Sequence, residues 1–303
     1  MLWAMAEVIR AEQLTKSYGQ NRGIVDVDFS VEAGEVFGYL GPNGAGKSTT
    51  IRLLLDLIRP SSGRLTLFGL DSRRKSVEIR KRMGYLPGDL RLYERMTGGD
   101  LLGYFAHLRG LEGPERWQQL AGRLDLDLGR QIKELSRGNR QKVGIVQAFM
   151  HEPDLLVLDE PTSGLDPLVQ ETFYELVAEA TQRGGTVFLS SHVLSEVQHM
   201  ADRVGLIREG RLDLVDSVEN LRAAFTRVEA TFAEPPPADA FASVPGVERV
   251  ERDGTVVRFA LEGEIDALLK ALARFHVKAL DVREADLEDV FLARYRGEEP
   301  DAS

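Results

Sequence analysis

The order of hydrophobic and polar positions over the first two thirds of the chain predicts a series of strands and helices. Short strand-like segments lie at residues 8–14, 25–31, 36–40, 65–68, 83–87, 155–158 and 186–190. The last two are continuous apolar runs, which are typical of strands buried on both faces of a parallel sheet. Apolar residues recur at helical spacing between residues 97 and 149 and again from 167 to 183. This alternation predicts an α/β fold.

A different pattern begins after about residue 220, where a Pro235-Pro236-Pro237 cluster follows. Strand-like segments lie at residues 228–232, 247–252, 255–261 and 277–282, and helix-like segments at 265–275 and 287–295. Asp253 and Gly254 join the middle strands as a hairpin turn would. We therefore predict a first domain at residues 1–222, a small α+β domain with a ferredoxin-like arrangement at 223–296, and a disordered tail at 297–303.

The composition is that of a soluble globular protein with a large core: 303 residues, of which 43% are hydrophobic and 28% charged. A formal net charge of −10 argues against a broad surface for nucleic acid, so we expect no nucleic-acid partner. The lack of cysteine excludes disulfides and thiolate metal sites and fits the cytoplasm. We expect no signal peptide and no membrane-spanning run, so a transport role would need a separate membrane partner.

A glycine-rich loop stands between the strand at 36–40 and a helix-like run at 50–55. It reads Gly41-Pro42-Asn43-Gly44-Ala45-Gly46-Lys47-Ser48-Thr49. The spacing Gly-x-x-x-x-Gly-Lys-Ser lets the backbone N–H groups of residues 43–49 point at phosphate oxygens, while Lys47 reaches the outer phosphates. The helix that begins near Lys47 adds the positive end of its dipole, and Ser48 can ligate Mg²⁺. The loop predicts a site for a nucleoside triphosphate.

Two consecutive carboxylates end the apolar run at residues 155–158. Asp159 is placed to hold Mg²⁺ through its waters, and Glu160 to polarise a water for in-line attack on the γ-phosphate. An exposed acidic strand end is the structural alternative, but the phosphate loop upstream favours the catalytic interpretation. We predict that the nucleotide is hydrolysed.

Further motifs occur in a fixed order around these two. Leu135-Ser136-Arg137-Gly138-Asn139-Arg140-Gln141 precedes a helix, Ser163-Gly164-Leu165-Asp166 follows the paired carboxylates, and His192 follows a strand that ends in Ser190-Ser191. Tyr18 lies upstream of the phosphate loop, in Lys16-Ser17-Tyr18-Gly19. Over residues 7 to about 220, this set of motifs resembles the ATP-binding cassette (ABC) ATPases, whose usual signature is Leu-Ser-Gly-Gly-Gln.

The resemblance implies a P-loop NTPase fold, an ABC-type nucleotide-binding domain with a helical subdomain. The roles that it implies fall into three groups: catalysis by Lys47, Glu160 and His192; Mg²⁺ binding by Ser48 and Asp159; and ATP binding by Tyr18, the loop at 41–49, Ser136, Gly138 and Asp166. Ser136, at the start of a helix, would offer its hydroxyl and nearby N–H groups to the γ-phosphate of an ATP bound by a second copy. The implied assembly is therefore a homodimer that shares two ATP molecules.

Two departures from the family pattern stand out. The family usually has a glutamine after the Tyr-x-Pro strand end, whereas this chain has Gly88 and Asp89. Either Asp89 takes over the contact with Mg²⁺ or water, or Gly88 leaves a more open site. In the signature, Arg137 replaces a glycine and Asn139 the glutamine, and Arg137 either adds positive charge near the phosphate or projects into solvent.

The resemblance also implies a transport role. Residues 287–291, Leu-Glu-Asp-Val-Phe, resemble the C-terminal extensions of ATPase subunits from bacterial multidrug and antibiotic exporters. We predict an ATPase that energises a separate integral-membrane permease for export of drugs, antibiotics or lipophilic compounds, and that is cytoplasmic and peripheral on the inner face of the membrane. The alternatives are a soluble ABC ATPase that acts on ribosomes or DNA, and a C-terminal ligand-sensing or dimerising module with the ATPase as its output.

Overall fold

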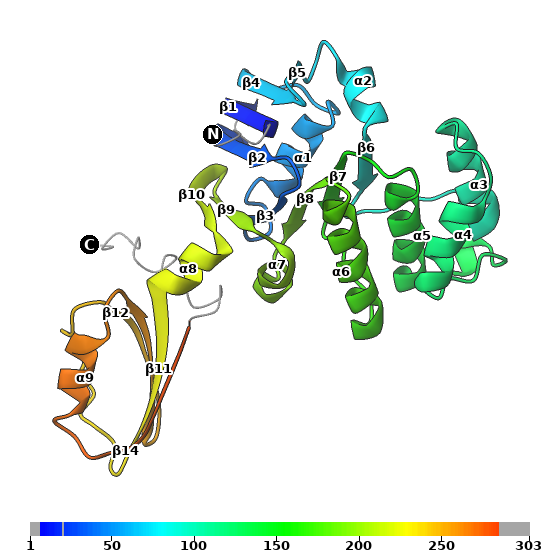
Figure 1. Cartoon of the computed structure of the whole chain (residues 1–303). Helices are drawn as coiled ribbons and strands as arrows, with labels where there is room; N and C mark the ends of the chain where they lie inside the picture. The colour runs from blue at the N-terminus through cyan, green and yellow to red at the C-terminus, as the bar shows by residue number, and fades with distance from the viewer. Residues whose placement is uncertain (1–6, 20, 285–303) are drawn as a thin grey trace. The chain divides into compact units, whose positions relative to one another are not determined.

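The computed structural model of the chain describes residues 7–19 and 21–284 (Figure 1). Its contacts divide the chain into two compact units, Met1–Val215 and Asp216–Ser303. The helix predicted at 287–295 and the tail predicted at 297–303 lie outside the described residues. The first unit has two sheets and the second unit has one, and each unit has its own hydrophobic core.

A six-stranded sheet, in the order β10-β9-β3-β8-β7-β6, forms the centre of the first unit. Its strands are β3 (Val36–Leu40), β6 (Met83–Leu86), β7 (Leu155–Asp159), β8 (Thr186–Ser191), β9 (Arg203–Arg208) and β10 (Arg211–Ser217). Strand β8 lies between β3 and β7, and all these pairings are parallel. Every residue of β3, β7 and β8 is buried, as predicted for continuous apolar runs in a parallel sheet. The carboxyl ends of β3, β7 and β8 consequently meet at one edge of the sheet.

A second, antiparallel sheet packs on the first. Its order is β2-β1-β4-β5, from strands β1 (Glu7–Tyr18), β2 (Asn21–Glu32), β4 (Ser62–Leu67) and β5 (Leu70–Asp71). Phe29 of β2 lies with its ring centroid 5.7 to 5.9 Å from those of Phe37, Tyr39 and Phe188 in the parallel sheet. These aromatic contacts join the two sheets into one core.

Helices surround the parallel sheet and supply the rest of the first unit: α1 (Lys47–Leu54), α2 (Ser76–Lys81), α3 (Gly98–Leu108), α4 (Glu115–Arg123), α5 (Arg137–Phe149), α6 (Pro167–Gln182) and α7 (Leu194–Met200). Figure 1 shows α3, α4 and α5 grouped together on one side, which gives the helical subdomain that the family resemblance implied. The region at 97–149 is thus helical as predicted, apart from the connections between these helices and a short 3₁₀ turn at Ile132–Glu134.

The second unit has a four-stranded antiparallel sheet and, among its described residues, two helices. The sheet has the order β12-β13-β11-β14. Its elements are β11 (Phe225–Phe232), β12 (Val247–Asp253), β13 (Val256–Glu262), α9 (Asp266–Leu272) and β14 (Val277–Glu284), preceded by α8 (Val218–Ala224). All four predicted strands and the first predicted helix are present. Turns replace the helix that a ferredoxin-like arrangement has between its first two strands, here β11 and β12.

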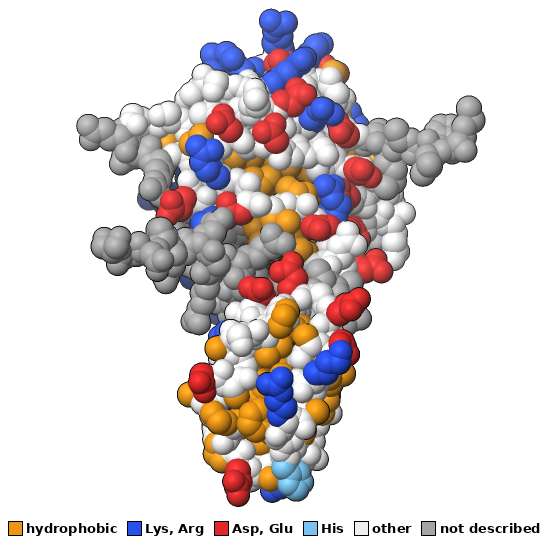
Figure 2. Space-filling model, turned by 90° about the vertical axis from the view of Figure 1, so that its left-hand side faces the viewer, with side chains coloured by type: hydrophobic (Ala, Val, Ile, Leu, Met, Phe, Trp, Pro, Cys, Tyr) orange, Lys and Arg blue, Asp and Glu red, His pale blue; other side chains and the backbone are white. Residues whose placement is uncertain are grey.

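Hydrophobic side chains also gather on an exposed face of this second unit (Figure 2). Leu280 and Val282 of the edge strand β14 are 42% and 48% exposed. They pair directly with Ala230 and Val228 of β11, which are fully buried. Directly paired residues of antiparallel strands point to the same face. Leu280 and Val282 therefore lie on the core face of the sheet, at its edge, where the described residues leave them partly exposed.

Candidate functional site

The glycine-rich loop connects β3 to α1 in the tight course that its sequence predicts. Gly44 and Gly46 have φ values of 82° and 118°, a region that favours glycine, and α1 begins at Lys47. A Cβ on Gly41 would lie 2.3 Å from the carbonyl oxygen of Ile207, so the loop passes directly against β9. Gly41 and Gly46 have no room for a Cβ without displacement of a neighbour, whereas Gly44 is favoured by its backbone angle alone.

The Lys47 side chain bonds back to the start of the glycine-rich loop. It is only 7% exposed, and its Nζ donates hydrogen bonds to the carbonyl oxygens of Gly41 at 2.5 Å and Pro42 at 3.4 Å. The same Nζ lies 3.5 Å from Oε1 of Glu160. The ammonium of Lys47 thus lies between the loop carbonyls and the Glu160 carboxylate.

Asp159 ends β7 with both carboxylate oxygens engaged. Its Oδ2 accepts a hydrogen bond from Ser48 Oγ at 3.2 Å, and its Oδ1 accepts one from Ser190 Oγ at 2.5 Å. Ser190 is a site residue that the sequence marked only as the end of a strand. Burial, and secondly the negative charge of Asp159, raise the pKa of the Tyr85 phenol to about 12. Asp159 is itself only 8% exposed.

The oxygen atoms of Ser48 and Asp159 fit a magnesium ion. Magnesium prefers oxygen ligands and is commonly held by one or two protein groups together with phosphate oxygens and water. Within residues 7–19 and 21–284, no three or more His, Asp or Glu side chains gather as a metal cage made by the protein alone. Ser48 and Asp159 are the two site residues that could hold such an ion.

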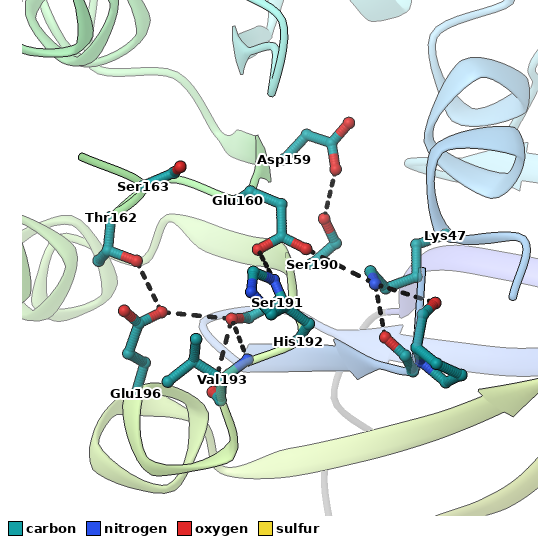
Figure 3. Close-up of polar contacts among 12 residues, drawn as sticks. Lys47, Asp159, Glu160, Thr162, Ser163, Ser190, Ser191, His192, Val193 and Glu196 are labelled. Atoms are coloured by element: carbon teal, nitrogen blue, oxygen red, sulfur yellow. Dashed lines mark hydrogen bonds and ion pairs between the residues drawn. The ribbon is translucent and has the colours of Figure 1, made fainter. Parts of the chain in front are cut away.

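Glu160 points at a histidine from the neighbouring strand end. Its Oε2 lies 2.7 Å from Nδ1 of His192, which follows β8 (Figure 3). Because a carboxylate accepts the bond, Nδ1 carries the proton. Glu160 has a φ of 50°, in the left-handed region that few non-glycine residues adopt. The backbone turn after Asp159 thus directs the two consecutive carboxylates to different partners.

A pocket of about 460 Å³ collects most of the predicted site. Its predicted lining residues are Pro42, Asn43, Gly44, Gly46, Lys47, Ser48, Thr49, Asp159, Glu160 and His192. Other residues that line it are Gly23, Arg52, Gly88, Asp89, Arg137 and Ser163. Gly41 and Ala45 are buried beneath it, and Tyr18, Ser136, Gly138 and Asp166 do not line it. The volume lies in the range of small-molecule sites.

The chain is similar to known proteins both in sequence and in fold. The sequence profile of the ABC transporter family matches residues 24–163. A bacitracin transport ATP-binding protein, BcrA of Bacillus licheniformis, is 36% identical over 211 residues, which cover 69% of each chain. The chain belongs to the ABC transporter family. It is an ATP-binding subunit, and it is an ATPase coupled to transport.

Two further comparisons agree with this assignment. YbhF of Escherichia coli, a probable multidrug ABC transporter ATP-binding protein, is 36% identical over 222 residues, which cover 71% of this chain but only 38% of that longer protein. A solved ATP-binding subunit of an ABC transporter superposes with a TM-score of 0.66 at 30% identity, over 71% of this chain and 92% of that one. The family match at residues 24–163 lies within the first unit of the chain.

Tyr18 stands beside the pocket of this ABC subunit. It ends β1 and is 42% exposed, and a Cβ on Gly23 would lie 3.3 Å from its ring. Gly23 itself lines the pocket. Lys16 Nζ lies over the ring, 5.3 Å from its centroid.

The signature sequence packs against the loop that follows Glu160. Ser136 is exposed and caps α5, with Oγ accepting a hydrogen bond from Asn139 N at 3.2 Å. A Cβ on Gly138 would lie 2.6 Å from the carbonyl oxygen of Gly164, so the two backbones touch. Of the two interpretations of Arg137, the structure favours positive charge at the pocket, because Arg137 lines it and donates from Nη2 to Ser163 Oγ at 2.8 Å.

Asp166, at the end of the same loop, has a local structural contact. Its Oδ1 accepts a hydrogen bond from Val169 N at 3.1 Å and caps α6, whose first residue is Pro167. The carboxylate is exposed and lies outside the pocket of its own chain.

The structure distinguishes the two interpretations of the departure at Gly88 and Asp89. The Asp89 side chain is 82% exposed and forms an ion pair with Arg91 at 3.1 Å. A Cβ on Gly88 would come only to 3.4 Å from the Asp159 carboxylate. Asp89 thus lines the open pocket with a carboxylate that is exposed to solvent and paired with Arg91, and the short Gly88 leaves the approach to Asp159 open.

Replacing Asp89 by Ala is expected to leave the steady-state rate of ATP hydrolysis within about twofold, because exposed ion pairs contribute little. Hydrolysis can be measured by phosphate release at saturating ATP. Asp159→Ala, measured in parallel, is expected to lose most activity. A tenfold loss in the Asp89 variant would mean that this carboxylate reaches the metal or the water.

Proposed function

We propose that this chain binds ATP with Mg²⁺ in the pocket between β3, β7 and β8, hydrolyses it within a homodimer, and thereby drives export through a separate permease. The observation that carries the proposal is the convergence of Lys47, Asp159, Glu160 and His192 from three strand ends at one pocket. Each is the residue type that phosphoryl transfer needs at that place: a cation, a metal ligand, a base and a hydrogen-bond donor.

Binding comes from the loop and the lysine. The backbone N–H groups of residues 43–49 and the ammonium of Lys47 hold the phosphates, with the dipole of α1 adding to the positive potential. When bound by Ser48 and Asp159, Mg²⁺ neutralises charge on the phosphate oxygens. Tyr18 offers its ring to adenine at the side of the pocket.

Glu160 and His192 supply the chemistry at the γ-phosphate. Glu160 accepts the proton of the attacking water, whose oxygen forms the new bond to phosphorus as the bond to ADP breaks. A neutral His192 that donates its Nδ1–H to Glu160 has no second N–H. To donate to the γ-phosphate, the ring must therefore either become protonated or release Glu160. The 2.7 Å contact couples the base to the residue that senses the phosphate.

ATPase subunits of this family act as dimers and pair with membrane-spanning permease subunits. We propose a homodimer in which Ser136, Gly138 and Asp166 complete the ATP site of the second copy. Support comes from Ser136, which is exposed at the start of α5 and does not line the pocket of its own chain. The Ser136 hydroxyl accepts a bond from Asn139 N and keeps its own proton to donate, so this helix start is suited to contact a phosphate supplied by another molecule.

Dimerisation can be measured with the Glu160→Gln variant, which is expected to accumulate with uncleaved ATP. Sedimentation with Mg²⁺ and ATP is expected to give a dimer, and without nucleotide a monomer. Adding Ser136→Trp, which places a large ring where the shared phosphate would lie, is expected to prevent the dimer. A monomer under all conditions would contradict the shared site.

We propose that the transported compounds are antibiotics or other drugs. The relatives named for bacitracin transport and for multidrug transport support this class. No helix in the described part of the chain has the length and apolar character to cross a membrane. The chain would accordingly be a cytoplasmic subunit, held at the inner face of the membrane by its permease, with no nucleic-acid partner.

The test of coupling is ATP hydrolysis by the purified chain with and without its permease. A hydrolysis rate that rises or falls when the permease is added supports a transport subunit, and an unchanged rate contradicts it.

We further propose that residues 1–222 form the ABC domain and 223–296 an accessory domain. The separate core of the second unit, built around Phe232, Phe241 and Phe259, supports that division.

A further inference from the structure

A second set of hydrogen bonds lies directly beside the catalytic pair. Glu196, on α7, accepts two bonds at one carboxylate oxygen, Oε2: from Thr162 Oγ1 at 2.6 Å and from Ser191 Oγ at 3.2 Å. Ser191 Oγ also accepts a bond from Val193 N at 2.9 Å (Figure 3). Glu196, Thr162 and Ser191 do not line the ATP pocket. They therefore have no direct part in the binding proposed above.

This bridge joins the two segments that carry the catalytic groups. Thr162 lies two residues after Glu160, and Ser191 immediately precedes His192. The hydroxyl-bearing residues are 4% and 1% exposed, so water competes little for their bonds. Hydrogen bonds from buried hydroxyls to a carboxylate are stronger than neutral ones. The Glu196 carboxylate thus ties the loop after β7 to the end of β8.

The hydrogen bond between Glu160 and His192 lies next to this bridge and needs both residues to be held in place. Glu160 holds a left-handed backbone conformation, which persists only where the surrounding structure maintains it. The His192 side chain is 53% exposed, so packing alone does not hold the ring in place. Small displacements of a base or a donor can cost a large part of the rate, since proton transfer depends on distance and direction.

We propose that Glu196 is a positioning residue for ATP hydrolysis: acting through Thr162 and Ser191, it sets the separation of Glu160 and His192. This inference rests on the proposed roles of Glu160 and His192. Since Glu196 contacts neither the phosphate loop nor the pocket, it affects turnover and not ATP binding.

The experiment compares kcat and KM for ATP among variants of the full chain. Glu196→Leu is expected to lower kcat about 10- to 100-fold while KM changes by less than about threefold. Glu196→Gln keeps an oxygen that can accept both bonds, and its kcat is expected within about threefold of the parent. Ser195→Ala, on the exposed side of the same helix, is the matched control and is expected to be unchanged.

Thr162 provides an independent arm that leaves Glu196 in place. Thr162→Val removes the hydroxyl at nearly constant volume and is expected to lower kcat as Glu196→Leu does, whereas Thr162→Ser restores the hydroxyl and the rate. The double variant Thr162→Val with Glu196→Leu is expected to lose little more than either single one, because both remove the same bridge. If Glu196→Leu does not fold, the pair Thr162→Val and Thr162→Ser still decides.

Several outcomes would overturn the inference: an unchanged kcat in Glu196→Leu, a loss confined to KM, failure of Thr162→Ser to restore the rate, or additive losses in the double variant. The Glu160→Gln variant distinguishes failure of the positioning role from failure of the proposed function. Normal hydrolysis by Glu160→Gln would overturn the assignment of the base. Loss of hydrolysis in Glu160→Gln with normal hydrolysis in Glu196→Leu would overturn the positioning role alone.

Discussion

Replacing Glu160 by Gln is expected to lower the turnover of ATP about 10² to 10⁴-fold while ATP binding stays largely intact. The amide has nearly the shape of the carboxylate and cannot accept the proton of the attacking water. Glu160 also lies 2.7 Å from His192 and 3.5 Å from Lys47, so the change weakens the polar contacts of both. Single-turnover phosphate release and equilibrium binding of ATP separate the two effects.

The matched control for this variant is Glu171→Gln, which makes the same chemical change on an exposed residue of α6. It is expected to hydrolyse ATP at the parent rate. Near-normal hydrolysis by Glu160→Gln would remove this carboxylate from the mechanism. Loss of binding along with turnover would instead make Glu160 part of the nucleotide cradle.

Replacing Lys47 by Met is expected to weaken ATP binding about 10- to 150-fold and to remove most hydrolysis. A hydrogen bond from a charged donor contributes about 1.5–3 kcal/mol, which corresponds to that range of affinity. Methionine keeps much of the length of the side chain but leaves the loop without its cation. Titration of ATP by calorimetry in the presence of Mg²⁺ measures the affinity directly.

Lys142→Met is the control for removing a buried lysine. Lys142 is 8% exposed, close to the 7% of Lys47, and its Nζ donates to the carbonyl oxygen of Asp125 away from the pocket. Its loss is expected to affect stability but not the affinity for ATP. Equal affinity in Lys47→Met and the parent chain would contradict the phosphate-binding role of the loop lysine.

Several parts of the site could be predicted because their information is local. The loop at 41–49 needs glycine at defined positions, and its backbone conformation follows from those residues together with the strand before it and the helix after it. Asp159 and Glu160 end a strand that is apolar throughout, so the sequence marks the point where the strand leaves the core. The shared carboxyl edge of a parallel sheet then brings the loop and the carboxylates together.

Other contacts depend on side chains that approach from distant segments. Ser190 donates to Asp159 because β8 lies next to β7, and no feature of the sequence distinguishes this serine from Ser191. Arg137 bonds to Ser163, a partner that neither interpretation of its charge had included. The strands β9 and β10 and the helix α7 were also not predicted, since short apolar runs near charged residues give a weak periodic signal.

The sequence by itself determined the class of this protein: a nucleotide-binding α/β cassette with a phosphate loop, a carboxylate pair and a second small domain. Those features reside in backbone geometry and in local spacing, which neighbouring residues control. Only the tertiary structure decided where individual polar groups point. Asp89 pairs with Arg91, Arg137 contacts Ser163, and Glu196 joins the segments of Glu160 and His192. The physical reason is that a side chain chooses its hydrogen-bond partner from whatever the packed fold brings within about 3 Å, and that choice is made between segments far apart in the chain.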